Sequence, residues 1–240
     1  MLRRVLRPGF PALLLAGACG GGVRLAPLPL PANLAPASLA EATRWADSTL
    51  PSEHRDIRFN WTLQDQFDAS GGGNGRARLA PPDSIRLDVR GSLGLARAAA
   101  FVVGDFAVWA EPQQEVERLV PNYPLFWAML GIARPPDPGS AVARYTDANL
   151  TAWQFTLGQD TLVYLRENGA GSRLIAEVRQ GARRLGRVET KFGPDGLPTH
   201  SRLIVVQPAT RVELTFTQHV KAQPFAADTW ARPAEPARDR

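Results

Sequence analysis

The sequence predicts a mainly β protein with helices: an incomplete antiparallel β-barrel of about ten to twelve strands with two or three helices across its open face. Apolar and polar residues alternate along most of the chain between residues 56 and 220. Strands with one apolar and one polar face pair in antiparallel sheets. Turn signals rich in Gly, Pro and Asn separate these runs. One segment, 123–132, is almost wholly apolar, which predicts a helix buried on all sides.

The first 18 residues predict a secretory signal peptide. Arginines at positions 3, 4 and 7 precede a short apolar run, and small residues lead into Cys19, the only cysteine of the chain. The apolar run has about nine residues, which is too short to span a bilayer. Small residues directly before a cysteine resemble the lipobox of bacterial lipoproteins, and this resemblance implies that Cys19 carries a lipid. The open alternative is an ordinary signal peptide with an incidental cysteine.

The segment 19–37 predicts a flexible tether between this anchor and a folded domain. Three glycines follow the cysteine, and four spaced prolines favour an extended chain. The folded domain is expected over 38–230, and the Pro- and Arg-rich residues 231–240 are expected to form a disordered tail.

The first element of the domain is an expected helix over 38–50. Ser38 and Glu41 have the spacing of a capping box, apolar residues follow at helical spacing, and Pro51 ends the run. The strands begin at residue 56, where Ile57, Phe59, Trp61 and Leu63 alternate with polar residues.

Two interruptions of the strand pattern are expected. The glycines of 71–75 predict a hairpin loop, and residues 113–120 predict a short amphipathic turn. After that turn, the apolar helix of 123–132 is expected to lie across the open face of the sheet together with the helix of 38–50.

A half-closed sheet cannot fill its own concave face, so the apolar residues there are candidates for lining a ligand cavity. The apolar helix is expected to form the roof of this cavity. The candidates are Phe59, Trp61, Leu63, Ile85, Leu87, Val89, Phe101 and Val103 on the strands, with Trp127, Met129 and Leu130 in the roof. The residues alone leave an open cavity and a filled core as equal alternatives.

Three local patterns resemble the bacterial outer-membrane lipoprotein-sorting proteins LolA and LolB. They are the strand of 84–94 with its Leu-Gly turn, the Trp-x-x-Leu-Gly segment that starts at Trp127, and the Gly-Pro-Asp-Gly turn at 193–196 before the last strands. The lipid anchor makes the resemblance closer to LolB. It implies a half-barrel with a helical lid that binds acyl chains of lipids or lipoproteins, and a role as a chaperone in lipoprotein transport to the outer membrane.

The same resemblance implies further roles and a location. It places Leu93 and Leu95 on a loop that inserts into the membrane, and it places the protein in the periplasm-facing cell envelope. The alternative function is an envelope sensor or scaffold with a filled barrel that binds another protein.

Enzymatic chemistry is not expected from the sequence. His54, His200 and His219 have no metal-binding spacing, and no nucleophile motif is present, so neither a catalytic residue nor a metal or cofactor is predicted. The formal charge of +5, less the three arginines of the signal, leaves +2. Basic and acidic residues alternate along the strands, so no one-sided basic patch and no nucleic-acid partner are expected.

Overall fold

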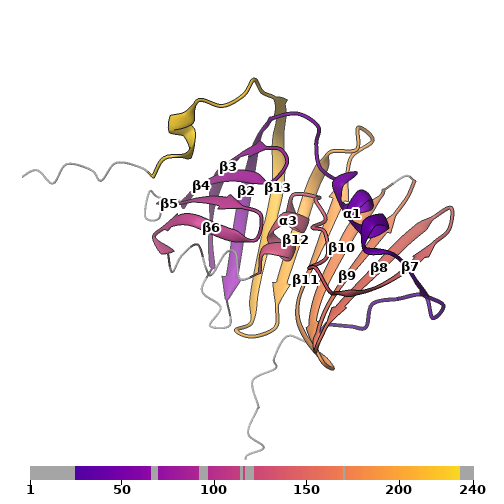
Figure 1. The fold of residues 1–240 in the computed structure, drawn as a ribbon. Helices are drawn as coiled ribbons and strands as arrows, with labels where there is room; N and C mark the ends of the chain where they lie inside the picture. Colours follow the sequence, from indigo (N-terminus) through magenta and orange to yellow (C-terminus); the bar gives the residue numbers. More distant parts are fainter. Residues whose placement is uncertain are drawn as a thin grey trace, which may run out of the picture.

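The computed structural model describes residues 25–65, 70–91, 97–113, 116, 122–169 and 171–232. Thirteen strands form a single antiparallel sheet that curves but does not close (Figure 1). The predicted fold class is therefore confirmed. The strand count exceeds the expected ten to twelve because the Pro-rich N-terminal segment adds the two-residue strand β1.

The sheet consists of two meanders that join between β13 and β2. Its order is β1-β7-β8-β9-β10-β11-β12-β13-β2-β3-β4-β5-β6. The bounds are Ala35–Pro36 (β1), Arg55–Asp65 (β2), Ser70–Ala80 (β3), Ser84–Gly91 (β4), Arg97–Val103 (β5), Phe106–Glu111 (β6), Ala141–Thr146 (β7), Leu150–Leu157 (β8), Asp160–Glu167 (β9), Arg173–Gln180 (β10), Arg183–Phe192 (β11), Pro198–Val205 (β12) and Thr210–Lys221 (β13).

Two helices, α1 (Leu39–Asp47) and α3 (Tyr123–Met129), lie on one face of the sheet, which we call the inner face (Figure 1). The capping box predicted for α1 is present, since the Ser38 hydroxyl accepts from the backbone N–H of Glu41 at 3.2 Å and the Glu41 carboxylate accepts from the Ser38 N–H. The rings of Trp45, Trp153 and Tyr164 pack together between α1 and the strands β8 and β9.

Helix α3 is buried from Leu125 to its end, and the chain stays buried through Ile132, as the apolar composition of 123–132 predicts. The side chain of Asn122 caps it by accepting from the backbone N–H of Leu125 at 3.3 Å. Gly131 follows the helix at φ +80°, and a Cβ there would lie 2.7 Å from the ring of Phe192. A glycine is therefore required where the chain leaves α3.

The glycines at 71–75, predicted as a hairpin loop, are instead part of strand β3. They pair with Phe59, Trp61 and their neighbours on β2. The rings of Phe59 and Trp61 lie over the glycine backbone of β3. A Cβ on Gly75 would lie 2.3 Å from the ring of Phe59, and one on Gly73 would lie 1.8 Å from the carbonyl oxygen of Arg90. The glycines make room for bulky neighbours, which a count of turn-forming residues does not reveal.

The opposite, outer face of the sheet is covered at two places by the ends of the described chain. Near the N-terminal end, Leu28, Leu30 and Leu34 pack against a cluster of buried side chains from β8, β9 and β10. The sequence placed the start of the folded domain at residue 38, whereas the contacts of the domain extend back to Ala26. Cys19 and the signal peptide lie outside the described residues.

The C-terminal segment covers the outer face at β4–β6. Trp230, in the short 3-10 helix η2 (Ala227–Trp230), stacks on Phe101 with ring centroids 5.1 Å apart. The guanidinium of Arg86 donates to the carbonyl oxygen of Thr229 at 2.7 Å, and the indole N–H of Trp109 donates to that of Trp230 at 2.9 Å. The chain is thus held to the sheet up to this point, just before the predicted tail.

A buried carboxylate organises the outer face between β10 and β11. Glu177 is fully buried and forms ion pairs with Arg179, Arg184 and Arg187. Arg187 also donates to the carbonyl oxygen of Ala26 at 2.6 Å, so this cluster fastens the N-terminal segment to the sheet.

Candidate functional site

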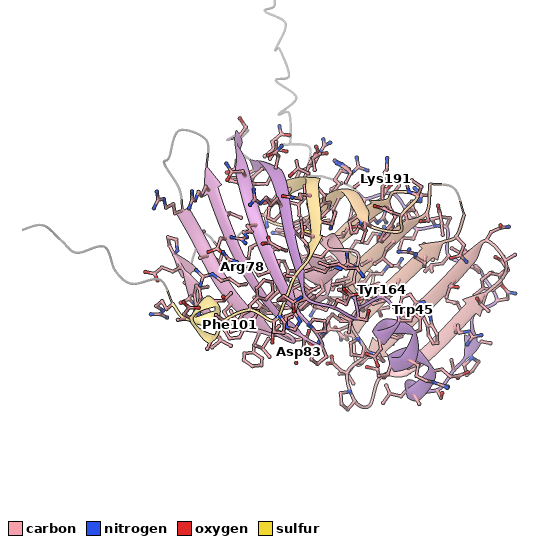
Figure 2. All side chains as sticks on the ribbon, turned by 90° about the horizontal axis from the view of Figure 1, so that it is seen from above. Trp45, Arg78, Asp83, Phe101, Tyr164 and Lys191 are labelled. Atoms are coloured by element: carbon pink, nitrogen blue, oxygen red, sulfur yellow. The ribbon has the colours of Figure 1, made fainter. Side chains whose placement is uncertain are left out.

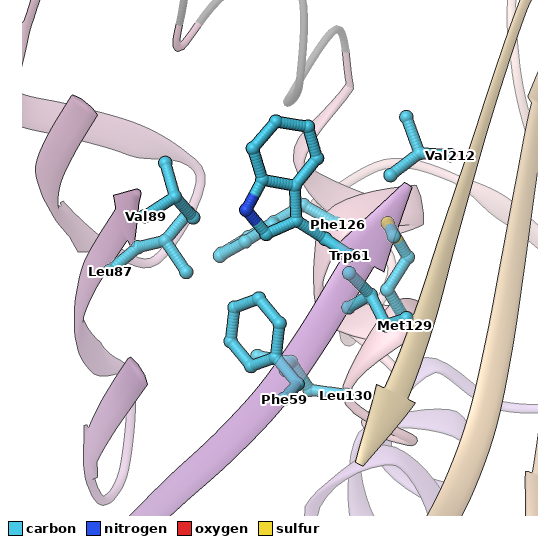
Figure 3. Close-up of a pocket in the computed structure, with 9 residues that line it drawn as sticks. Phe59, Trp61, Leu87, Val89, Phe126, Met129, Leu130 and Val212 are labelled. Carbon is cyan, nitrogen blue, oxygen red and sulfur yellow. The ribbon is translucent and has the colours of Figure 1, made fainter. Parts of the chain in front are cut away.

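A pocket with an entirely apolar lining lies between α3 and the inner face of the sheet. The strands β2, β4 and β13 supply six of its side chains, and α3 with the residue after it supplies the other three (Figure 3). We call this the apolar pocket. Its lining is Phe59, Trp61, Leu87, Val89, Phe126, Met129, Leu130, Val212 and Leu214.

The polar atom of the one amphipathic lining residue is turned away from the pocket. The indole N–H of Trp61 donates to the carbonyl oxygen of Arg90 at 3.2 Å, which leaves the ring carbons as the wall. Phe59 packs edge-on against Phe216 with ring centroids 6.2 Å apart. Without a charged or titratable lining group, the pocket can accept only an apolar group.

The volume of the apolar pocket is about 30 Å³, which leaves room for no more than a few water molecules. Pockets that hold drug-sized ligands measure roughly 300–1,000 Å³. In this conformation the half-barrel is therefore nearly filled, and a hydrocarbon tail can enter only when α3 or the side chains it carries move.

Six of the eleven predicted cavity residues line the pocket: Phe59, Trp61, Leu87, Val89, Met129 and Leu130. Two others belong to the surrounding core, since Ile85 is fully buried and Leu63 is partly buried against it. The prediction missed Phe126, Val212 and Leu214. Alternation along β13 placed Val212 and Leu214 on the apolar face, but only the pairing of β13 with β2 brings them beside the pocket.

Phe101, Val103 and Trp127 are not part of the pocket. Alternation along β5 turns Ala98, Ala100 and Val102 to the inner face, and it turns the positions of Phe101 and Val103 to the outer face. The sequence analysis assigned Phe101 and Val103 to the interior because large apolar residues are rare on the outer face of a sheet. The C-terminal segment covers this part of the outer face, so an apolar residue is buried there as well.

Trp127 is fully buried on another side of α3. Its indole N–H donates to the carbonyl oxygen of Gly104 at 2.8 Å, and the guanidinium carbon of Arg134 lies 5.1 Å from its ring centroid. It fastens the helix rather than roofing the pocket. Leu93 and Leu95, the predicted membrane-inserting pair, lie outside the described residues.

Buried hydrogen bonds hold α3 and the chain after it to the sheet. The hydroxyl of Thr190 donates to the carbonyl oxygen of Ala128 at 2.7 Å and lies 2.8 Å from the hydroxyl of Ser201. The Tyr164 hydroxyl accepts from the backbone N–H of Arg134 at 3.0 Å. Burial raises the pKa of Tyr164 well above its usual value, so this hydroxyl remains protonated.

The histidines serve packing in this structure. His219 lies 2.7 Å from the carbonyl oxygen of Pro198, and burial lowers the pKa of its ring below the usual value. His54 packs edge-on against Phe225, with ring centroids 5.6 Å apart. Within the described residues, no group of three His, Cys, Asp or Glu side chains is arranged to hold a metal ion. None of the helices in this part of the chain is long and apolar enough to cross a bilayer.

Comparison with known proteins finds similarity at the level of structure alone. No family model matches the chain, and no curated protein matches it. A solved LolA superfamily protein from Nitrosomonas europaea has a TM-score of 0.47 and 9% identity, over 82% of this chain and 98% of the other.

Two further solved structures resemble the chain. A domain named as an outer membrane lipoprotein-sorting protein, from Vibrio parahaemolyticus, has a TM-score of 0.45 and 8% identity, over 80% of this chain and 94% of the other. MucB has a TM-score of 0.35 and 14% identity, over 82% of this chain and 63% of the other. The first two of these structures are named as a LolA superfamily protein and as a lipoprotein-sorting domain, the group to which the sequence patterns were compared above. At these scores the likenesses establish nothing about what this chain binds.

Proposed function

We propose that this chain is a membrane-anchored envelope lipoprotein that binds an acyl chain of a lipid or lipoprotein between α3 and the inner face of the sheet. The observation that carries the proposal is the apolar pocket, whose nine lining side chains include no charged group. Such a lining has no partner for a polar substrate. Each methylene group that it buries contributes about 0.8 kcal/mol.

Acyl binding requires α3 to act as a movable lid, because the apolar pocket, at about 30 Å³, is far smaller than an acyl chain. Three of the nine lining side chains, Phe126, Met129 and Leu130, come from the lid and the residue after it. Met129 is unbranched and flexible, so it can repack around chains of different shape. Displacing this one short helix enlarges the pocket while the six side chains on the strands stay in place.

The anchor and the location are parts of the same proposal. Lipid on Cys19 holds the protein to a membrane, which we place at the periplasm-facing surface of the outer membrane. Leu93 and Leu95 insert into that membrane when cargo is delivered. Replacing Cys19 with Ser is expected to abolish labelling by palmitate and to let high salt release the protein from the membrane fraction. Retention in the membrane fraction at high salt, without label, would contradict the anchor.

The acyl site is tested by quenching of tryptophan fluorescence with a brominated fatty acid, using the full chain with Cys19→Ser. The indole of Trp61 forms a wall of the pocket, so its emission is expected to fall when the brominated chain enters. Trp61→Phe is expected to lose most of this quenching. The matched control is Trp45→Phe, which removes a tryptophan packed under α1 and is expected to leave the quenching unchanged. Equal quenching in both variants would count against the proposal.

A second candidate function is an envelope scaffold that binds another protein, with the interior permanently filled. It is favoured by the small volume of the apolar pocket and by the edge strand β6, where Phe106 is 58% exposed and Val108 is 51% exposed. An exposed apolar edge strand is a common docking site for a strand of a partner. Crosslinking from β6 that captures one envelope protein, without any quenching by the brominated chain, would select this function.

A further inference from the structure

The outer face of strands β2–β5 forms a basic hollow, which contradicts the expectation that no one-sided basic patch exists. The hollow has a volume of about 760 Å³. We call it the arginine basin. Its six basic residues are Arg58, Arg76, Arg78, Arg86, Arg90 and Arg97. Figure 2 labels Arg78 among these strands. The six arginines come from four different strands, and no single strand supplies more than two of them.

Carboxylates neutralise only part of this charge. Asp56 forms a bidentate pair with Arg76, and Asp88 pairs with Arg78 at 2.9 Å and with Arg86 at 3.0 Å. Glu111 is the remaining carboxylate at the basin. Six arginines against these three acids leave three positive charges on the face.

The uncompensated charge belongs to the exposed arginines. Within the described residues, none of Arg58, Arg90 and Arg97 forms an ion pair with a carboxylate, and all three are exposed. The pKa of Arg78 is lowered by burial and, next, by the neighbouring Arg76, as expected where like charges crowd together.

The polar residues of the basin suit a compact oxyanion. Asn60 and Asn74 are exposed and pair across β2 and β3, and the hydroxyl-bearing Thr217 lies beside them. Ala99, which pairs with Asp88, adds only a methyl group to the floor of the basin. Arginine guanidinium groups bind phosphate oxygens through paired hydrogen bonds, and amide groups add further donors.

The position of the basin in the sheet distinguishes a membrane surface from a soluble anion. Arg90 and Arg97 pair across β4 and β5, where β4 ends and β5 begins. Midway along β11, on the same outer face of the sheet, Arg187 holds the carbonyl oxygen of Ala26. Ala26 follows Cys19 by seven positions, so the proposed anchor joins the domain on the face of the sheet that carries the exposed arginines.

We propose that the arginine basin binds the phosphate groups of anionic membrane lipids and thereby turns the outer face of β2–β5 toward the bilayer. The proposal rests on the membrane anchoring proposed above and adds a site that the anchor does not supply.

The test uses the full chain with Cys19→Ser, so that no lipid anchor contributes. Cosedimentation is measured with vesicles of phosphatidylcholine alone and of phosphatidylcholine mixed with phosphatidylglycerol. Binding is expected only to the mixed vesicles and is expected to weaken as salt is added. Each exposed arginine near an anionic surface contributes about fivefold to affinity, so Arg90→Gln with Arg97→Gln is expected to weaken binding by about 25-fold.

The matched control is Arg44→Gln with Lys191→Gln, which removes the same charge from exposed positions on α1 and β11, outside the basin. This control is expected to bind almost as tightly as the parent chain. Equal losses in the two double variants, or equal binding to both kinds of vesicle, would overturn the proposal. Complete competition by soluble glycerol phosphate would also overturn it, because the site would then serve a free anion.

The outcome is separable from that of acyl binding. The Arg90→Gln, Arg97→Gln variant is expected to keep the quenching of Trp61 by a brominated fatty acid, since the basin and the apolar pocket lie on opposite faces of the sheet. Vesicle binding without quenching would contradict acyl binding and leave the basin supported. Quenching without selective vesicle binding would support acyl binding and contradict the role of the basin.

Discussion

The lid, helix α3, can be loosened without changing the apolar pocket by removing the hydrogen bond that the Thr190 hydroxyl makes to it. This hydroxyl donates to the carbonyl oxygen of Ala128 in α3 at 2.7 Å, and both Thr190 and its neighbour Ser201 are fully buried. Thr190→Val keeps the shape of the side chain and removes this donor. We expect the variant to accept acyl chains faster than the parent chain.

The size of the effect follows from which bonds break when the lid opens. The contact between Thr190 and Ser201 joins β11 to β12 and persists with the lid open, so its loss affects overall stability rather than the lid. The bond to Ala128 exists only when the lid is closed. A hydrogen bond of this kind contributes about 1 kcal/mol net, which corresponds to about a fivefold change in the open population.

Stopped-flow quenching of Trp61 by a brominated fatty acid measures the entry rate. Ser201→Ala is the matched control, because it removes the contact to Thr190 and leaves the bond to α3. It is expected to lower overall stability with little change in entry rate. Equal acceleration in both variants, or none in Thr190→Val, would refute a lid held at this point.

Three further predictions concern stability. Glu177→Gln leaves three half-buried arginines without their carboxylate and is expected to lower the free energy of unfolding in urea by about 1.5–3 kcal/mol, the usual contribution of a hydrogen bond to a charged group. Glu213→Gln, at a more exposed pair, is expected to cost at most about 1 kcal/mol. Burial lowers the pKa of His219 in the folded chain, so the unfolded chain binds the proton first as the pH falls below 6.5. Stability present above that pH is therefore expected to decrease as the pH falls toward the folded pKa, and His219→Gln is expected to flatten this dependence of the urea midpoint. Gly75→Ala places a Cβ 2.3 Å from an aromatic ring and is expected to cost about 1–3 kcal/mol in thermal unfolding, while Gly71→Ala, with its nearest atom 3.9 Å away, is expected to cost less.

Local signals in the sequence were sufficient for the helices and for the fold class. The capping box at Ser38 depends on residues three positions apart, and both of its hydrogen bonds form in the structure. The helix of 123–132 was predicted from composition alone, because a segment with no polar face has to be buried wherever it lies. Alternation of period two likewise predicted the apolar face of β2 and β4, and hence four of the strand residues that line the apolar pocket.

Features that depend on neighbouring strands could not be predicted in this way. The glycines of β3 are explained only by the rings of β2 that lie over them, and the outward position of Phe101 only by a C-terminal segment more than a hundred residues later in the chain. The arginine basin depends on the registers of β2–β5, since arginines such as Arg58 and Arg90 meet at one hollow only after pairing. A one-residue shift in any of these registers would move the side chains of that strand to the other face.

A nearly filled pocket is compatible with a carrier when the filling belongs to a removable element. An acyl chain with about fourteen buried methylenes gains about 11 kcal/mol on leaving water, but almost none of this on leaving a bilayer, where it is already in hydrocarbon. Transfer from membrane to protein therefore has little hydrophobic driving force of its own. Its direction depends on terms of about 1 kcal/mol, which is the size of the bond from Thr190 to Ala128. An empty pocket would lack this control, because no contact would have to be broken for the chain to enter or leave.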